Sequence, residues 1–322
     1  MNQWMIKQTR IIINKICFDR PACAALLTWS VLLGLIGGLA GCASRPSAPP
    51  EPPAHAAPVA QKKPPRLGLA LGGGAARGFA HVGVIQVLEE AGIRPDLVVG
   101  TSAGSLVAAF YASGKTGAQL QQIAETMDEA TFTDWTLPIF SRGVLRGEAL
   151  ARYVGTQVGG RPIQEMPLPL GIVATDLQSG QGVLFRRGDT GTAVRASSAV
   201  PSVFQPVRIS GRDFVDGGLV APVPVRFARE MGAELVLAVD ISSPPEANAP
   251  EGSLQILLQT FAIMGKTING FELRDADVVL RPVLSGVGSA DFAARKRSIA
   301  AGRQAMQQAL PRLKELMQPR AS

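Results

Sequence analysis

The stretch "LALGGGAARGFAHVGVIQVL", residues 69–88, joins an apolar strand-like segment to a helix-like pattern through three consecutive glycines. In the pattern that follows, Val84, Ile85 and Leu88 share one helical face, and Gly92 provides a stop. Glycines at a strand-to-helix junction leave backbone N–H groups open to an anion. That anion can be the phosphate of a nucleotide or the oxyanion of an ester under attack, and a tight structural turn is the third interpretation.

The residues after the glycines disfavour nucleotide binding. A dinucleotide loop needs Gly or Ala at the position that Arg77 occupies, and a phosphate-binding P-loop needs a Gly-Lys-Ser/Thr ending that Arg77-Gly78 does not supply. An oxyanion hole needs only exposed N–H groups near the start of a helix. The glycine run is therefore compatible with an esterase, although it is not specific by itself.

A second motif, "DLVVGTSAGSLVAAF" at residues 96–110, gives the stronger signal. Gly100, Ser102 and Gly104 fit G-x-S-x-G between an apolar strand and a helix pattern, which is the context of a nucleophile elbow. The sharp turn requires small neighbours, and Gly100, Ala103 and Gly104 provide them. We therefore predict that Ser102 is a catalytic nucleophile rather than part of a structural turn.

The usual histidine base is missing from the expected place. The chain has two histidines, and neither follows Ser102. His55 lies in a proline-rich stretch, and His81 lies among apolar residues one turn into the first helix. The order Ser, Asp/Glu, His of common hydrolases therefore cannot be built, so either His81 acts from an unusual position or the base is a carboxylate. We interpret His81 as a packed residue that holds a backbone group.

A carboxylate is the remaining candidate for the base. Asp176, Asp213 and Asp216 all lie near expected strand ends, and Asp216 is followed by Gly217 and Gly218. Asp-Gly is a common turn dipeptide, so the pattern alone indicates a turn. Taken together with Ser102 and the absent histidine, it favours Asp216 as the base, with the two glycines leaving room for the serine to approach.

With these motifs in place, the chain resembles the patatin-like phospholipases, and in particular the bacterial branch related to neuropathy target esterase. The resemblance rests on "GGGAARGFAHVGV", "GTSAGSLVAA", "ATDLQSG", "ASSAVPSVFQPV" and "DGGLVAPVPV", in that order, from residue 67 to about residue 240. It implies a three-layer α/β/α fold with a mostly parallel central sheet. It also implies a Ser–Asp dyad of Ser102 and Asp216.

The resemblance further implies an oxyanion hole and a substrate class. The N–H groups of Gly72, Gly73 and Gly74 would bind the oxyanion, helped by that of Ala103. Arg77 would steady the loop or meet a phosphate head group, and a solvated arginine that caps nothing is the alternative. The implied reaction is hydrolysis of a phospholipid or lysophospholipid through an acyl-enzyme, without a metal or cofactor. A general carboxylesterase or thioesterase and a non-catalytic lipid-binding envelope protein remain as alternatives.

Alternating patterns predict a single α/β domain at residues 67–318. The expected strands are 67–71, 97–99, 168–174, 182–185, 207–209, 235–239 and 278–280. The expected helices are 79–91, 103–113, 118–127, 147–158, 192–197, 225–231, 254–271 and 292–316. The aromatic-rich stretch at residues 131–145 is either a lid over the site or ordinary loop packing.

The first 41 residues have the features of an export signal, with a basic start followed by an apolar run at residues 21–42. The tetrad Leu39-Ala40-Gly41-Cys42 resembles the bacterial lipobox, which predicts cleavage before Cys42 and lipidation of that cysteine. An uncleaved transmembrane anchor is the alternative. Because Ala43 rather than Asp follows the cysteine, we expect the periplasmic face of an outer membrane. Residues 43–66 hold eight prolines and read as a semi-rigid linker.

Charge and cysteine content exclude several functions. The formal net charge is +7, and without residues 1–41 it falls to +4, which does not argue for nucleic acid. All three cysteines lie at or before position 42, so the domain has no thiol for a disulfide, a zinc site or a cysteine nucleophile. With one histidine in the domain, we expect no metal.

Overall fold

The computed structural model describes residues 63–127, 134, 143–243, 252–288 and 290–318. All of these belong to one compact unit. The predicted signal, Cys42 and nearly all of the linker lie outside the described residues.

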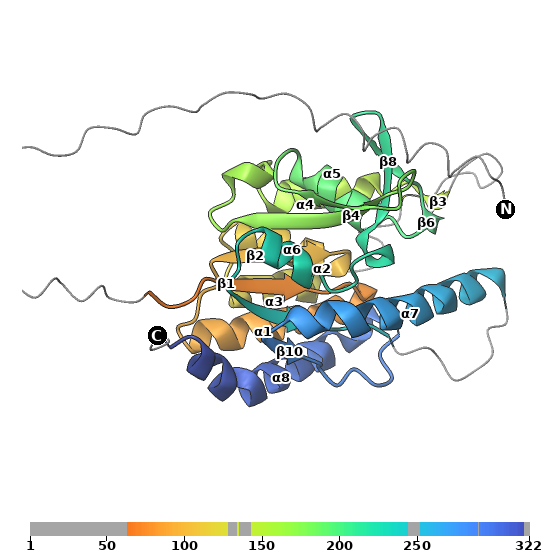
Figure 1. The fold of residues 1–322 in the computed structure, drawn as a ribbon. Helices are drawn as coiled ribbons and strands as arrows, with labels where there is room; N and C mark the ends of the chain where they lie inside the picture. Colours follow the sequence, from red (N-terminus) through yellow and green to blue (C-terminus); the bar gives the residue numbers. More distant parts are fainter. Residues whose placement is uncertain (1–62, 128–133, 135–142, 244–251, 289, 319–322) are drawn as a thin grey trace, which may run out of the picture. The chain divides into compact units, whose positions relative to one another are not determined.

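The domain is built on an eight-stranded sheet with helices on both faces (Figure 1). Its main path runs in the order β10-β9-β1-β2-β4-β8-β7, and β5 pairs with β4. The five strands from β10 to β4 are parallel, whereas β5, β7 and β8 run antiparallel to their neighbours. The strands of this sheet are β1 (Leu67–Leu71), β2 (Leu97–Thr101), β4 (Leu170–Asp176), β5 (Gly182–Phe185), β7 (Val207–Ile209), β8 (Arg212–Asp216), β9 (Leu235–Val239) and β10 (Val278–Leu280).

The expected α/β fold with a mostly parallel sheet is therefore confirmed. Three short strands were not expected from the sequence, namely β8, β3 (Gly143–Leu145) and β6 (Ser202–Phe204), of which β3 and β6 form a separate parallel pair. The helices are α1 (Phe79–Glu90), α2 (Ala103–Ala112), α3 (Gly117–Thr126), α4 (Glu148–Gln157), α5 (Thr190–Ser197), α6 (Val225–Glu230), α7 (Ser253–Glu272) and α8 (Arg295–Leu316).

Alternation along β1 divides the core between the two faces of the sheet. Leu67, Leu69 and Leu71 belong to the larger cluster, which α1, α2 and α8 help to form, whereas Ala70 belongs to a smaller cluster with residues of α6. All four side chains are fully buried. A strand buried on both faces reads as a continuous apolar run, which is why the sequence predicts its bounds correctly.

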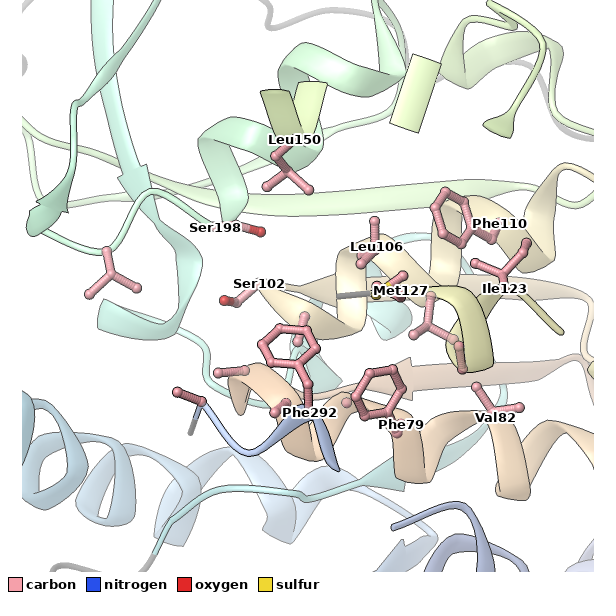
Figure 2. Close-up of a pocket in the computed structure, with 18 of the residues that line it drawn as sticks. Phe79, Val82, Ser102, Leu106, Phe110, Ile123, Met127, Leu150, Ser198 and Phe292 are labelled. Carbon is pink, nitrogen blue, oxygen red and sulfur yellow. The ribbon is translucent and has the colours of Figure 1, made fainter. Parts of the chain in front are cut away.

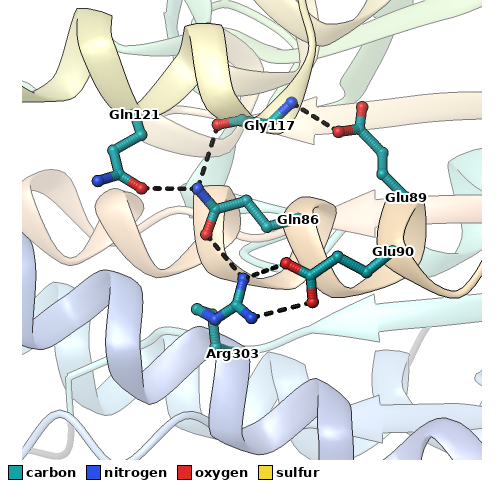
Figure 3. A network of polar contacts seen from close by, with 6 residues as sticks. All are labelled: Gln86, Glu89, Glu90, Gly117, Gln121 and Arg303. Carbon is teal, nitrogen blue, oxygen red and sulfur yellow. Dashed lines mark hydrogen bonds and ion pairs between the residues drawn. The ribbon is translucent and has the colours of Figure 1, made fainter.

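Helices α1 and α8 pack side by side along one face (Figure 1). They come so close that a Cβ at Gly302 would lie 1.9 Å from the carbonyl oxygen of Ala80. Beside this contact, Arg303 of α8 reaches Glu90 of α1 through two hydrogen bonds of 2.7 and 2.9 Å (Figure 3). Gln86 extends the network to the start of α3, where it bonds to the side chain of Gln121.

Candidate active site

Ser102 lies at the junction of β2 and α2, as the motif predicts. Its backbone has φ 53° and ψ −124°, which is an unusual conformation for a residue other than glycine. A residue distant in the sequence holds this turn in place, because the N–H of Ser102 donates to the Oγ of Ser197 at 2.9 Å. Ser197 in turn donates to the carbonyl oxygen of Val173 in β4 at 2.6 Å. The elbow is therefore connected to the central sheet.

Gly100 and Gly104 are required by close packing of the backbone. A Cβ at Gly100 would lie 2.4 Å from the carbonyl oxygen of Gly104. A Cβ at Gly104 would lie 2.1 Å from the carbonyl oxygen of Leu71 in the neighbouring strand β1. The small residues of the motif thus allow α2 to begin directly against the sheet.

The glycine run lies beside the serine, since a Cβ at Gly73 would lie 3.1 Å from the Cβ of Ser102. However, the N–H groups of Gly72 and Gly73 are already engaged. Gly72 donates to the carbonyl oxygen of Val239 at 3.0 Å, and Gly73 donates to that of Pro222 at 2.9 Å. Neither group is free to bind an oxyanion, contrary to the sequence-based expectation.

The N–H groups of Gly74 and Ala103 differ from these two. Among the residues that the structure describes, neither has a hydrogen-bond acceptor. Ala103 is the first residue of α2, so its N–H also lies at the positive end of the helix. Of the four residues expected to bind the oxyanion, Gly74 and Ala103 therefore remain as candidate donors.

Asp216 is the last residue of β8 and is buried. One of its oxygens, Oδ1, accepts the N–H of Gly218 at 2.7 Å. Within the described part of the chain, the other oxygen, Oδ2, has no hydrogen-bond partner. Burial raises the pKa of Asp216 to about 6, while the hydroxyl of Ser102 and the N–H of Gly218 oppose that rise. The Ser102 hydroxyl is therefore near enough to Asp216 to influence the pKa of its carboxyl group.

The two glycines after Asp216 have structural roles that differ from the expected one. A Cβ at Gly217 would lie 2.2 Å from the carbonyl oxygen of Val173, so this glycine permits close packing on β4 rather than approach of the serine. Gly218 supplies the N–H that orients the carboxylate. The other two candidate acids are differently engaged: Asp176 is ion-paired with Arg212, and Asp213 lies near Arg208.

His81 is a packed residue, as interpreted from the sequence. It is fully buried on α1, and its Nε2 lies 2.8 Å from the carbonyl oxygen of Gly72. A carbonyl oxygen only accepts, so Nε2 carries the proton. Burial lowers the pKa of His81 to about 4, which keeps the ring neutral at physiological pH. Its role is to hold the glycine run in place.

Arg77 and Gly78 continue the glycine loop into the first helix. Arg77 is buried, which contradicts a solvated arginine, and its Nε has no partner in the described part of the chain. Burial lowers the pKa of Arg77, and the negative charge of Asp240 opposes this effect. A Cβ at Gly78 would lie 3.0 Å from the Cβ of Ala103, so Gly78 allows this loop to lie against the elbow.

A cavity of about 330 Å³ opens beside Ser102 (Figure 2). Most of the side chains around it come from α1, α2 and α3 and from the segment after α5, and nearly all are apolar. Ser102 and Ser198 carry the polar side-chain atoms of the lining. Labelled members of the lining include Phe79, Leu106, Phe110, Ile123, Met127 and Phe292. Such a cavity suits a hydrocarbon chain whose ester end lies at the serine.

Sequence reasoning missed two parts of this site. Ser197 acts through the backbone of a residue 95 positions away, and three of the five residues of β8 are charged, which resembles a loop. The proposed lid at residues 131–145 lies mostly outside the described residues. Of its described part, Leu145 lines the cavity, and Asp134 accepts the N–H groups of Gly147 and Ala149 at the start of α4.

The described residues contain neither a metal-binding cluster nor a membrane-spanning helix. They hold no group of three or more His, Cys, Asp or Glu side chains arranged to bind a metal ion. In the same part of the chain, none of the helices combines the length and the apolar character needed to cross a bilayer.

The family model described as patatin-like phospholipase matches residues 69–229 of the chain. This protein belongs to the patatin-like phospholipase family. An uncharacterized NTE family protein of Mycobacterium tuberculosis is 38% identical over 179 residues, which cover 55% of this chain and 49% of that protein. The human patatin-like phospholipase domain-containing protein 6 is 33% identical over 190 residues, which cover 56% of this chain and 14% of that protein.

The chain thus spans about half the length of the NTE family proteins it matches first. Among solved structures, the crystal structure of VipD from Legionella pneumophila is similar, with a TM-score of 0.55 at 16% identity. The match covers 78% of this chain and 68% of that chain. At this identity the similarity supports the fold alone, and it agrees with the α/β sheet described above.

Proposed function

We propose that this protein is a lipid acyl hydrolase of the phospholipase A or lysophospholipase type, with Ser102 as nucleophile and Asp216 as base. The observation that supports the proposal is that Ser102 lines an apolar cavity of about 330 Å³, while its hydroxyl influences the pKa of the buried Asp216. The serine would supply the attacking oxygen, the carboxylate would remove its proton, and the cavity would hold the acyl chain of the substrate.

In the first half of the reaction, the Oγ of Ser102 attacks the ester carbonyl carbon and its proton passes to Asp216. The carbonyl oxygen becomes an oxyanion that the N–H groups of Gly74 and Ala103 stabilise. The bond from the carbonyl carbon to the alcohol oxygen then breaks, and Asp216 returns the proton to the leaving alcohol. The acyl group remains on Ser102.

In the second half, water attacks the acyl-enzyme and gives its proton to Asp216. The bond from the acyl carbon to Oγ breaks, Asp216 returns the proton to Oγ, and the carboxylic acid leaves. A carboxylate with an ordinary pKa near ~3.9 is a weak base toward a hydroxyl. The raised pKa of Asp216 makes it a better base while leaving it ionised above about pH 6.

The test is lipid mass spectrometry after incubation with mixed phospholipids and lysophospholipids. Wild type should release fatty acid, and the Ser102→Ala and Asp216→Asn variants should not. A fluorophosphonate probe should label wild type but not Ser102→Ala. If wild type is neither labelled nor active on any ester, the non-catalytic lipid-binding alternative replaces this proposal.

A series of esters of increasing acyl length separates the proposal from a general carboxylesterase or thioesterase. The apolar lining predicts that kcat/KM rises from short to long chains. Ile123→Phe, which enlarges a side chain in the lining, should shift the preference to shorter chains. Gln122→Phe, at the exposed neighbouring position, serves as its control. A flat profile for wild type would favour the general esterase.

We also propose that the protein is exported and anchored by lipidation of Cys42, with the proline-rich residues 43–66 as spacer. The lipobox-like tetrad is what supports this proposal. Metabolic labelling with a palmitate analogue in a bacterial host should mark wild type and not Cys42→Ser. Labelling of both proteins, or of neither, would contradict it.

A further inference from the structure

Helix α7 exposes large apolar side chains along its outward face. Ile256 is 54% exposed, Ile263 51%, Met264 44% and Phe271 63%. These four residues are spaced i, i+7, i+8 and i+15, so they lie on one side of the helix. In the C-terminal half of α7 the opposite side packs on the domain and includes Gly265, Asn269 and Glu272, which are buried. Nearer the start of the helix, Leu258 on that opposite side is 42% exposed.

The outward face carries no charge and offers little to water. The ionisable residues of α7 are Lys266 and Glu272, and Glu272 is buried in an ion pair with Arg226. Thr260 and Thr267 also lie on the outward side. Their hydroxyls donate to carbonyl oxygens one turn earlier, those of Ile256 and Ile263, at 2.8 and 3.3 Å. Hydroxyls satisfied within their own helix tolerate an apolar medium.

The helix is fixed to the part of the domain that holds the candidate site. The Nδ2 of Asn269 donates to the Oγ of Ser242 at 2.8 Å, just after β9. A Cβ at Gly265 would lie 3.6 Å from Pro222, the residue whose carbonyl accepts the N–H of Gly73. From this attachment α7 runs outward along the domain (Figure 1). No side chain from Gln255 to Met264 is buried.

We propose that the outward face of α7 docks this protein onto the surface of a lipid bilayer, with the helix lying in the plane of the interface. A continuous apolar face that lacks charge and free hydrogen-bonding groups suits acyl chains, whereas it gives a protein partner no specific polar contact. Cations border the face: Lys266 is exposed, and the guanidinium of Arg274 lies 5.0 Å from the ring centre of Phe271. These charges would contact lipid phosphates.

This inference rests on the proposed lipid hydrolase function, because docking would bring the cavity beside Ser102 to the lipid substrate. Binding is nevertheless tested independently of catalysis. A Ser102→Ala background leaves the lipids intact, and serines replace Cys17, Cys23 and Cys42 in the full chain. A single cysteine at Met264 then carries an environment-sensitive fluorophore. The matched control carries the fluorophore at Leu177, which is 48% exposed outside α7.

Both proteins are mixed with vesicles of phosphatidylcholine and phosphatidylglycerol whose acyl chains are brominated. The expected result is quenching of the fluorophore at position 264 and none at position 177. Equal emission from position 264 with brominated and plain lipids, while the protein floats with the vesicles, would overturn the proposal. Energy transfer between labelled copies without lipid would also overturn it, because α7 would then be an interface between copies of this chain.

A second measurement uses Ile263→Glu in the catalytically intact chain. A charge on the apolar face should lower hydrolysis of vesicle phospholipid by about tenfold or more, since about 1.4 kcal/mol of binding is a factor of ten. Hydrolysis of a soluble ester should stay within about twofold. Equal hydrolysis of vesicles by both proteins would contradict the docking role. Loss of all activity in the parent would instead concern the proposed function.

Discussion

The hydroxyl of Ser197 holds the backbone of Ser102, with 2.9 Å between the Oγ of the first and the nitrogen of the second. The same hydroxyl donates to Val173 in the sheet. A positive φ at a serine is strained, and it persists only where surrounding groups hold it. Ser197 is thus a positioning residue for the candidate nucleophile, although its side chain lines no part of the cavity.

We therefore expect Ser197→Ala to lower kcat more than it changes KM. A buried N–H without a partner costs about 1–3 kcal/mol, which predicts a loss of roughly two- to tenfold in kcat if half of that cost falls on the transition state. Steady-state kinetics on a soluble ester provide the measurement. Ser113→Ala is the control, because the hydroxyl of Ser113 bonds within its own helix end. A change in KM alone would contradict the positioning role.

The raised pKa of Asp216 predicts the pH profile of the reaction. A general base must be ionised, so kcat/KM should rise as pH increases and level off above a midpoint near 6, the pKa of Asp216. His81 cannot set this midpoint, since its pKa is lowered to about 4 and its Nε2 is engaged with Gly72. A profile that shifts when His81 is changed to Gln, but not when Asp216 is changed to Glu, would reverse the assignment.

The raised pKa of Asp216 also predicts that its ionised carboxylate lowers the free energy of unfolding. Burial raises the pKa of Asp216 from 3.8 in the unfolded chain to about 6, so the native state holds more protons between these values. The contribution of Asp216 to the stability of the fold is therefore fully present below pH 3.8 and is lost as pH rises through 6. A difference of about two pH units corresponds to about 3 kcal/mol.

Asp216→Asn removes this cost and should be more stable than wild type at pH 8 by up to about 3 kcal/mol. The difference should shrink as pH falls toward 4. Because burial keeps His81 neutral in both proteins, its own acid destabilisation cancels in the comparison. Thermal unfolding of the pair at matched pH values is the measurement. A variant that is less stable than wild type at pH 8 would show that Asp216 stabilises the fold in its charged form.

The sequence predicts those parts of the site that rest on local rules. Ser102 stands out because a nucleophile elbow needs small residues within two positions of the serine, between a strand and a helix. The oxyanion donors were predicted less well. Whether Gly72 and Gly73 have free N–H groups depends on Val239 and Pro222, which are distant in the chain. Hydrogen bonds of this kind leave no local pattern.

Helix α7 illustrates a second limit. Its expected span, residues 254–271, agrees closely with the observed Ser253–Glu272 because an apolar helical pattern is local. The same pattern normally indicates burial, however, and it cannot reveal that Ile263 and Phe271 face outward. Whether a face of this helix is exposed depends on which other elements of the fold pack against it.

Strand β8 shows the same limit. It is short and carries Asp213 between Arg212 and Phe214, so only its pairing with β4 makes it a strand.

The close contact of α1 and α8 predicts opposite effects of one substitution at two glycines. In Gly302→Ala the new methyl group would lie 1.9 Å from the carbonyl oxygen of Ala80, so the two helices must separate. Overpacking of this kind costs about 1–3 kcal/mol, or roughly 3–10 °C in Tm for a domain of this size. Separation would also weaken the contact of Arg303 with Glu90.

Gly155→Ala is the matched control for this prediction. Gly155 lies inside α4, and a Cβ there would have no neighbour within 4 Å. Alanine should fit without strain and stabilise the helix by about 0.5–1 kcal/mol. Thermal unfolding of both variants tests the pair, because helix propensity alone predicts that both substitutions raise Tm. A higher Tm for Gly302→Ala would mean that α1 and α8 are not in backbone contact.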